Sequence, residues 1–121
     1  MELLIVENNP EVSEVLTDYF TDQGYHVILV YSAEVALAAM EKCRVPFDAV
    51  ITTNALPEMS GVDMATVIKR DYPQTPVVLI SGTDLGPVPQ QVDAFYVKPF
   101  DIEELGHGVK RLVEEHSSAQ A

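Results

Sequence analysis

Five short apolar runs alternate with longer amphipathic stretches along this chain, and this alternation limits the fold more than any other feature. The runs are rich in β-branched or aromatic residues and cover residues 2–6, 26–30, 48–53, 76–80 and 94–97. Continuous apolar runs of this length are typical of strands buried on both faces of a parallel sheet. The pattern therefore predicts an α/β fold, a doubly wound three-layer α/β/α sandwich of the flavodoxin-like kind. Its five strands are expected in the order 2-1-3-4-5, which is common at this length.

Capping and spacing signals predict the helices between these strands. The first covers residues 10–23 and is capped by Asn9. The second follows Ser32, the third covers 61–72, and the last opens at Asp101 with a capping box. The apolar side chains that recur at helical spacing are expected to face the core: Val12, Val15, Leu16, Tyr19 and Phe20; Val35, Ala36, Ala39 and Met40; Met64, Val67 and Ile68; Leu105, Val109, Leu112 and Val113.

Glycine and proline interrupt this pattern at two places. Residues 81–93, between the fourth and fifth strands, contain two glycines and two prolines. They leave room for little more than one turn, so the fourth helix is expected to be short or missing. Gly106 and Gly108 lie inside the last helix, where each should weaken it by about 1 kcal/mol. The length predicts one domain, over 1–116, with a frayed tail or linker stub over 117–121.

The charge balance excludes several classes of partner. The formal net charge is −12, from 19 Asp and Glu against 7 Lys and Arg. Nucleic acid and anionic membranes attract basic surfaces, so direct binding to either is not expected. With neither a bilayer-spanning run nor a signal-peptide pattern, the sequence predicts a cytoplasmic protein. The lone Cys43 excludes an internal disulfide and is expected to be an ordinary core or surface thiol. The histidines lack metal-ligand spacing and are expected at the surface: His26, His107 and His116.

Polar residues follow four of the predicted strands. Glu7 and Asn8 follow the first strand, Thr53 ends the third, Ser81 follows the fourth and Lys98 follows the fifth. The carboxyl ends of parallel strands lie at one edge of the sheet, where ligands of such folds bind. We therefore expect these side chains to meet in one shallow crevice.

Four segments give the chain a resemblance to a known family. They are "LLIVENNPEV", "LPEMSG", "PVVLISG" and "AFYVKPFDIEEL", in that order along the sequence. Together they resemble the receiver domains of bacterial two-component response regulators. In that family an aspartate after the third strand accepts a phosphoryl group from a histidine kinase, and an acidic pair after the first strand helps it to hold Mg²⁺. The resemblance implies these equivalents: the acidic pair at Glu7 and Asn8, the phosphoacceptor at Thr53, phosphate contacts at Ser81 and Lys98, the switch aromatic at Phe95, and a cis peptide bond between Lys98 and Pro99.

This chain departs from the family at the residues that carry the chemistry. Pro57 and Gly61 fix the register of the loop, so the phosphoacceptor position falls on Thr53, which has no carboxylate. A threonine hydroxyl is a poor nucleophile unless a base activates it. Only Glu7 remains of three expected carboxylates, whereas Mg²⁺ prefers hard oxygen ligands. We expect no cofactor, lost or weak Mg²⁺ binding, and an ion pair between Glu7 and Lys98.

These departures predict a pseudo-receiver and not an enzyme: a phosphorylation-independent interaction module in a bacterial signalling pathway. Its partner would be a protein, namely a histidine kinase, an output domain or another regulator, and a homodimer is left open. The first alternative is a working switch that uses Thr53 or Asp84 as an unorthodox phosphoacceptor. The second is a flavodoxin-like cofactor binder or small enzyme, which the glycine-free loop "ENNPEV" disfavours.

Overall fold

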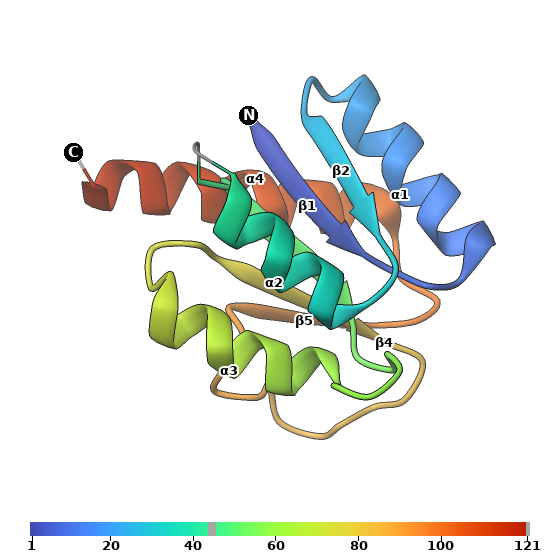
Figure 1. The fold of residues 1–121 in the computed structure, drawn as a ribbon. Helices are drawn as coiled ribbons and strands as arrows, with labels where there is room; N and C mark the ends of the chain where they lie inside the picture. The colour runs from blue at the N-terminus through green and yellow to red at the C-terminus, as the bar shows by residue number, and fades with distance from the viewer. Residues whose placement is uncertain (44–45, 121) are drawn as a thin grey trace.

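The computed structural model describes residues 1–43 and 46–120 and shows a parallel five-stranded sheet between two layers of helices (Figure 1). The strands are β1 (Glu2–Val6), β2 (His26–Val30), β3 (Ala49–Thr53), β4 (Val77–Ser81) and β5 (Ala94–Val97). The helices are α1 (Pro10–Asp22), α2 (Ala33–Lys42), α3 (Gly61–Asp71) and α4 (Ile102–Gln120). Among the described residues, no helix is both long and apolar enough to cross a membrane.

The strand order is β2-β1-β3-β4-β5, and every neighbouring pair is parallel, as predicted. Every residue of β3 and β4 is buried, which places these strands in the middle of the core. One face of the sheet packs against α1 and α4, through residues such as Leu16, Phe20 and Leu105. The other face packs against α2 and α3, through residues such as Met40, Met64 and Ile68. The polar strand ends therefore share one edge of the sheet.

The helix ends follow the predicted capping signals. The Asn9 side chain accepts hydrogen bonds from the backbone N–H groups of Glu11 and Val12 at the start of α1. Gly24, with φ of +95°, follows the end of this helix, a conformation that glycine adopts readily. The Asp101 carboxylate accepts from the N–H groups of Glu103 and Glu104 and so caps α4.

Two residues predicted to face the core lie on the surface instead. Val15 and Val35 are each 53% exposed. The buried stripe of α1 runs through Ser13, Leu16 and Phe20, and Val15 lies outside it. In α2 the buried residues are Ala33, Ala36 and Met40, and Val35 again lies outside. Periodicity located the apolar half of each helix correctly, but the neighbouring elements cover a narrower stripe than that half.

No helix lies between β4 and β5, where the sequence predicted a short or missing one. All of residues 82–93 are described, and none of them is helical. The last helix, α4, continues to Gln120, so the segment expected to fray from 117 onward is helical as far as it is described. Residue 121 lies outside the described residues. The domain limit at 116 stays a prediction.

Gly106 and Gly108 have a packing role that the sequence did not reveal. A Cβ atom at Gly106 would lie 2.6 Å from Cε2 of Tyr19 in α1, and one at Gly108 would collide with the hydroxyl of Tyr96 in β5. Because real side chains do not tolerate such distances, the two glycines let tyrosine rings lie directly against α4. The cost in helix propensity is thus offset by closer packing.

We predict that Gly106→Ala destabilises the protein, although alanine normally stabilises a helix interior by about 1 kcal/mol relative to glycine. Overpacking against Tyr19 should cost roughly 1–3 kcal/mol. In a Tyr19→Ala background the same change should become stabilising. Urea unfolding of the four proteins measures this cycle. A stabilising effect in the wild-type background would show that Tyr19 yields without cost.

The raised pKa of Tyr25 predicts that the free energy of unfolding falls at alkaline pH. Burial raises the pKa of Tyr25, and the nearby carboxylates of Asp48 and Glu114 raise it further. The folded state therefore holds the phenol proton more tightly than the unfolded chain, where the pKa is about 10. This stability is fully present below about pH 10 and is lost as the pH rises through the folded pKa.

Urea unfolding at about pH 8 and about pH 11 should show a steeper loss for the wild type than for Tyr25→Phe. Equal losses in the two proteins would mean that Tyr25 does not contribute to the alkaline instability.

Candidate functional site

The Lys98 side chain, at the end of β5, reaches residues at the ends of β1 and β3 at the carboxyl edge of the sheet. Glu7, directly after β1, is fully buried. Lys98, directly after β5, reaches across this edge, and its Nζ donates to Glu7 Oε2 at 3.1 Å. The predicted ion pair between these two residues is therefore present.

The Glu7 carboxylate is partnered at both oxygens. Oε2 accepts from Lys98, and Oε1 accepts from the backbone N–H of Asn9 at 3.0 Å. Its side chain is only 1% exposed, whereas that of Lys98 is 23% exposed. An ionised carboxylate is stable at such a depth only when it is paired and hydrogen-bonded. Asn9 is recognisable from the sequence as a helix cap but not as this backbone donor, because only the folded loop brings its N–H to Glu7.

Thr53 lies beside this pair. Its Oγ1 accepts a second hydrogen bond from Lys98 Nζ at 3.3 Å, and the residue is 2% exposed. The Lys98 ammonium is thus held by one carboxylate and one hydroxyl. Together, Glu7 and Lys98 carry no net charge.

The remaining predicted site residues are placed less directly. Ser81 is the last residue of β4 and is buried, and its Oγ accepts the N–H of Thr83 in the loop that follows. Asn8 is exposed. Phe95 is half-buried and packs against the core on the α2 and α3 side. The Lys98–Pro99 peptide bond is cis, as the resemblance implied.

The loop from β3 to α3 holds Thr53 in register. The backbone carbonyl of Asn54 accepts the N–H of Gly61, and the Asn54 side chain accepts the N–H of Val62. A Cβ atom at Gly61 would lie 3.0 Å from Asn54 Cα, so glycine permits this close approach. Glu58, at φ of +68°, is the centre of a γ-turn in which Met59 N–H donates to the Pro57 carbonyl. Pro57 and Gly61 thus fix the loop, as the sequence suggested.

The residues considered for other chemistry lie apart from this pair. Cys43 is exposed. His26 and His107 are exposed, and His116 is half-buried with Nδ1 2.9 Å from the Leu112 carbonyl. Within residues 1–43 and 46–120, no three His, Cys, Asp or Glu side chains gather as metal ligands would.

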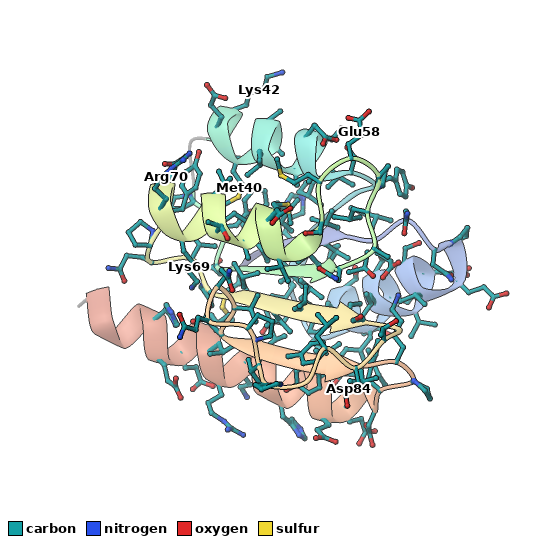
Figure 2. The ribbon with its side chains drawn as sticks, turned by 90° about the horizontal axis from the view of Figure 1, so that it is seen from below. Met40, Lys42, Glu58, Lys69, Arg70 and Asp84 are labelled. Carbon is teal, nitrogen blue, oxygen red and sulfur yellow. The ribbon has the colours of Figure 1, made fainter. Side chains whose placement is uncertain are left out.

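Charge differs between the two edges of the sheet. Figure 2 shows Glu58 and Asp84 at the edge toward which the strands point, and Lys69 and Arg70 at the opposite edge. Acids at helix starts and bases at helix ends complement helix dipoles, so part of this difference stabilises the helices.

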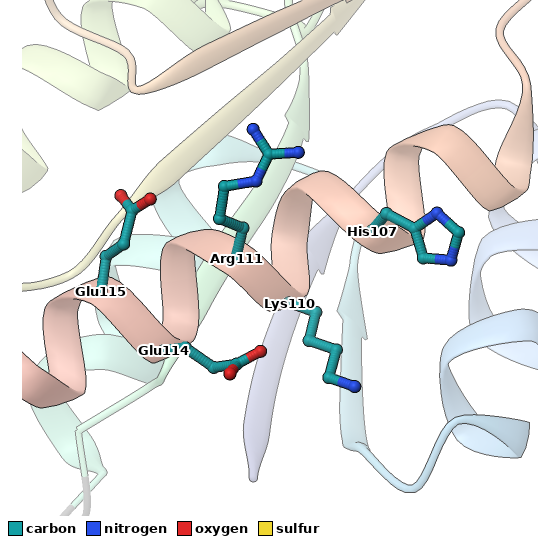
Figure 3. A pocket seen from close by; sticks show the side chains of 5 residues that line it. All are labelled: His107, Lys110, Arg111, Glu114 and Glu115. Atoms are coloured by element: carbon teal, nitrogen blue, oxygen red, sulfur yellow. The ribbon is translucent and has the colours of Figure 1, made fainter.

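Two hollows on the surface differ in composition. One, of about 560 Å³, lies beside the ion pair between α1 and the start of α4, and it is largely apolar: Glu11, Val12, Val15, Lys98, Pro99, Phe100 and Ile102. The other, of about 680 Å³, lies along α4 and is lined only by titratable side chains: His107, Lys110, Arg111, Glu114 and Glu115 (Figure 3). The second is typical of a solvated helix face, so we assign only the first to the site.

We predict that substituting Lys98 lowers the free energy of unfolding more than substituting Glu7. Lys98→Met leaves the buried Glu7 charge unpaired and should cost about 3–5 kcal/mol of unfolding free energy. Glu7→Gln should cost less, because Lys98 retains access to water. The double variant should lose less than the sum of the two single losses. Urea unfolding measures all four proteins, and strictly additive losses would argue against a coupled pair.

Comparison with known proteins gives consistent matches. The response regulator receiver domain family matches residues 3–110. The heme response regulator HssR of Staphylococcus saprophyticus is 27% identical over 119 residues, which cover 94% of this chain and 52% of that protein. The signal receiver domain of an HD domain-containing protein from Pseudomonas fluorescens Pf-5 has a TM-score of 0.89 at 23% identity, over 98% of this chain and 90% of that chain. The response regulator TrrA of Thermotoga maritima, in complex with Mg²⁺ and BeF, has a TM-score of 0.82 at 24% identity, over 92% and 97% of the two chains.

These matches differ in what they show. The chain spans about half the length of HssR and a smaller share of some other curated relatives. At 23% and 24% identity, the two solved structures show a shared fold. The family match reaches from β1 into α4 and includes every predicted site residue. This chain therefore belongs to the response regulator receiver domain family of two-component signalling.

Proposed function

We propose that this receiver domain works without phosphorylation, as a protein-interaction module in a bacterial two-component or phosphorelay pathway. The observation that carries the proposal is the contact of Lys98 with Glu7 and Thr53. The lysine that would contact a phosphoryl group is held by the protein itself. The residue that would accept the group has no carboxylate.

The chemistry of Thr53 supports this proposal. An acyl phosphate needs a carboxylate, and a threonine ester would need a base to activate the hydroxyl. Lys98 donates to Thr53 Oγ1 and to the Glu7 carboxylate, so the contacts at Thr53 place a donor and no base beside its hydroxyl. At 2% exposure, Thr53 is also poorly accessible to a protein kinase.

The residues at the cation position do not fit Mg²⁺. Mg²⁺ demands near-ideal octahedral oxygen geometry and is usually bound through one or two carboxylates. Here only Glu7 is acidic among the three positions, and each of its oxygens already accepts a hydrogen bond from the protein. A cation at Glu7 would compete with the Lys98 ammonium for the same carboxylate.

Asp84 is a weaker candidate for an unorthodox phosphoacceptor. Its Oδ1 accepts the N–H of Gly86, the usual role of aspartate in a turn. Among the described residues, no hydrogen bond or ion pair joins Asp84 to Lys98 or Ser81. No feature of the described site favours the flavodoxin-like cofactor binder or small enzyme.

The groove beside the ion pair supports an interaction role. Exposed Val15 lines it together with the apolar side chains of Phe100 and Ile102, and its charged lining residues are Glu11 and Lys98. An exposed apolar surface rimmed by charge is typical of a protein-binding site. A protein partner with apolar side chains flanked by lysine or arginine would complement it. A histidine kinase, an output domain and another regulator all remain candidates for that partner.

The proposal predicts that Mg²⁺ and beryllofluoride, a phosphoryl mimic, leave the site unchanged. Backbone amide signals in a proton–nitrogen NMR spectrum should not shift at millimolar Mg²⁺, nor after beryllofluoride is added. The signals to follow are those of Asn8, Thr53, Ser81, Phe95 and Lys98. Intact mass after treatment with acetyl phosphate and Mg²⁺ should show no added phosphoryl group.

The matched control restores the missing acids. The triple variant Glu7→Asp, Asn8→Asp and Thr53→Asp supplies three carboxylates, so its amides should shift and saturate with Mg²⁺. Saturating shifts in the wild type, or an added phosphoryl group on Thr53 or Asp84, would establish the unorthodox switch in place of the pseudo-receiver.

A further inference from the structure

Strand β5, which delivers Lys98 to the pocket, is the least covered strand of the sheet. It lies at an edge and pairs only with β4. None of its four residues is buried, whereas all five residues of β4 are. The connection that precedes it, residues 82–93, contains no helix. Packing alone therefore holds this strand less firmly than its neighbours.

Each end of β5 is fixed by an ion pair to another element. At the carboxyl end, Lys98 binds Glu7 and Thr53, and its backbone N–H donates to the Ser81 carbonyl at 2.7 Å. At the amino end, Asp93 binds Lys69 of α3. We call the Lys69–Asp93 pair and its hydrogen bonds the rear clamp.

The rear clamp consists of several hydrogen bonds between partly buried groups. Asp93 Oδ2 accepts both the Lys69 ammonium and the backbone N–H of Val77 in β4, the latter at 2.7 Å. Lys69 Nζ also donates to the Thr75 carbonyl at 3.2 Å. The side chains of Lys69 and Asp93 are only 26% and 23% exposed. Charge-assisted hydrogen bonds of this kind are stronger than those between neutral groups.

The two ends of β5 are too far apart to interact directly. Five residue steps separate Asp93 from Lys98, and at about 3.3 Å per residue in a strand they span roughly 16 Å. Sites at such a distance normally behave independently. An effect of one end on the other must therefore travel through the position of the strand itself.

We propose that Asp93 is a positioning residue for Lys98, so that the rear clamp holds the Lys98–Glu7 contact closed from the opposite edge of the sheet. This inference rests on the proposed function, since it assumes that the Lys98–Glu7 contact keeps Lys98 from acting on a phosphoryl group. Without the Asp93 ion pair, the amino end of β5 keeps its backbone hydrogen bond to the Val77 carbonyl and its pairing with β4, but it loses its anchor to α3 and gains freedom to shift. Lys98, at the other end, then leaves Glu7 and Thr53 more often.

The test is Asp93→Asn, a nearly isosteric change that keeps an acceptor for Val77 and removes the charge that binds Lys69. Two NMR readouts report on Lys98 in the absence of Mg²⁺. One is the side-chain ammonium signal, which is visible only while the ion pair slows its exchange with water. The other is hydrogen exchange of the backbone amide that donates to Ser81. We expect the first signal to broaden or vanish and the exchange to rise about tenfold or more.

Controls separate positioning from a general loss of stability. Asp93→Glu should restore both readouts at least in part, because it keeps the charge. His26→Gln removes the pair between His26 and Glu2 at the start of β2, the other edge strand, and should leave Lys98 unchanged. If Asp93→Asn does not fold, Lys69→Met releases the same clamp from its other side.

Several results would overturn the inference. They are unchanged Lys98 signals, an equal rise of exchange in all five strands, an equal effect of His26→Gln, and no recovery in Asp93→Glu. A saturating Mg²⁺ response of the wild type would instead refute the proposed function and leave the result on the clamp intact.

Discussion

The contact between Glu7 and Lys98 joins residues 91 positions apart, and the arrangement of the polar edge depends on it. In the sheet order, β3 and β4 lie between the strands that deliver them. The lysine thus crosses the ends of two strands, and the short polar side chains there, Thr53 and Ser81, leave room for it. A carboxylate at Thr53 would add a second negative charge beside Glu7, which one lysine could not neutralise. The neutral hydroxyl at Thr53 therefore keeps the charge of the Glu7–Lys98 pair balanced.

Sequence reasoning recovered what local patterns determine. The strands followed from apolar runs, the missing helix from the conformational limits of glycine and proline, and the cap at Asn9 from its residue type. The strand order followed from what is common in folds of this kind. Sequence patterns did not predict burial or packing that depends on neighbouring elements of the fold. Val15 and Val35 carry the helical spacing of core residues, yet the elements beside α1 and α2 leave both exposed. Gly106 and Gly108 read as helix-weakening residues, and only the folded chain shows the tyrosine rings that lie against them.

The site was predictable to a similar degree. The convergence of Glu7, Thr53 and Lys98 follows from the geometry of parallel strands, so their meeting could be expected. The hydrogen bonds that these side chains form could not be predicted from the sequence. The Ser81 hydroxyl, at the end of β4, accepts the N–H of Thr83 in the following loop, and the Asn9 N–H donates to the second oxygen of Glu7. The partners of Asp93 lie in α3 and β4, 24 and 16 residues away, and no local pattern marks them.

The missing helix and the neutral pocket have a joint consequence for the proposed function. A ligand shifts a conformational equilibrium only as far as its affinities for the two states differ. Without a phosphoryl group or a cation, the pocket has no small ligand that could supply this difference. Only a macromolecular partner could do so, through the groove beside Lys98 or through the weakly covered strand β5. Under the proposed function, the groove next to the ion pair exposes Val15 independently of phosphoryl donors, so binding there would depend on the concentration of the partner. Regulation of such a module then belongs to whatever controls that concentration, and not to chemistry at Thr53.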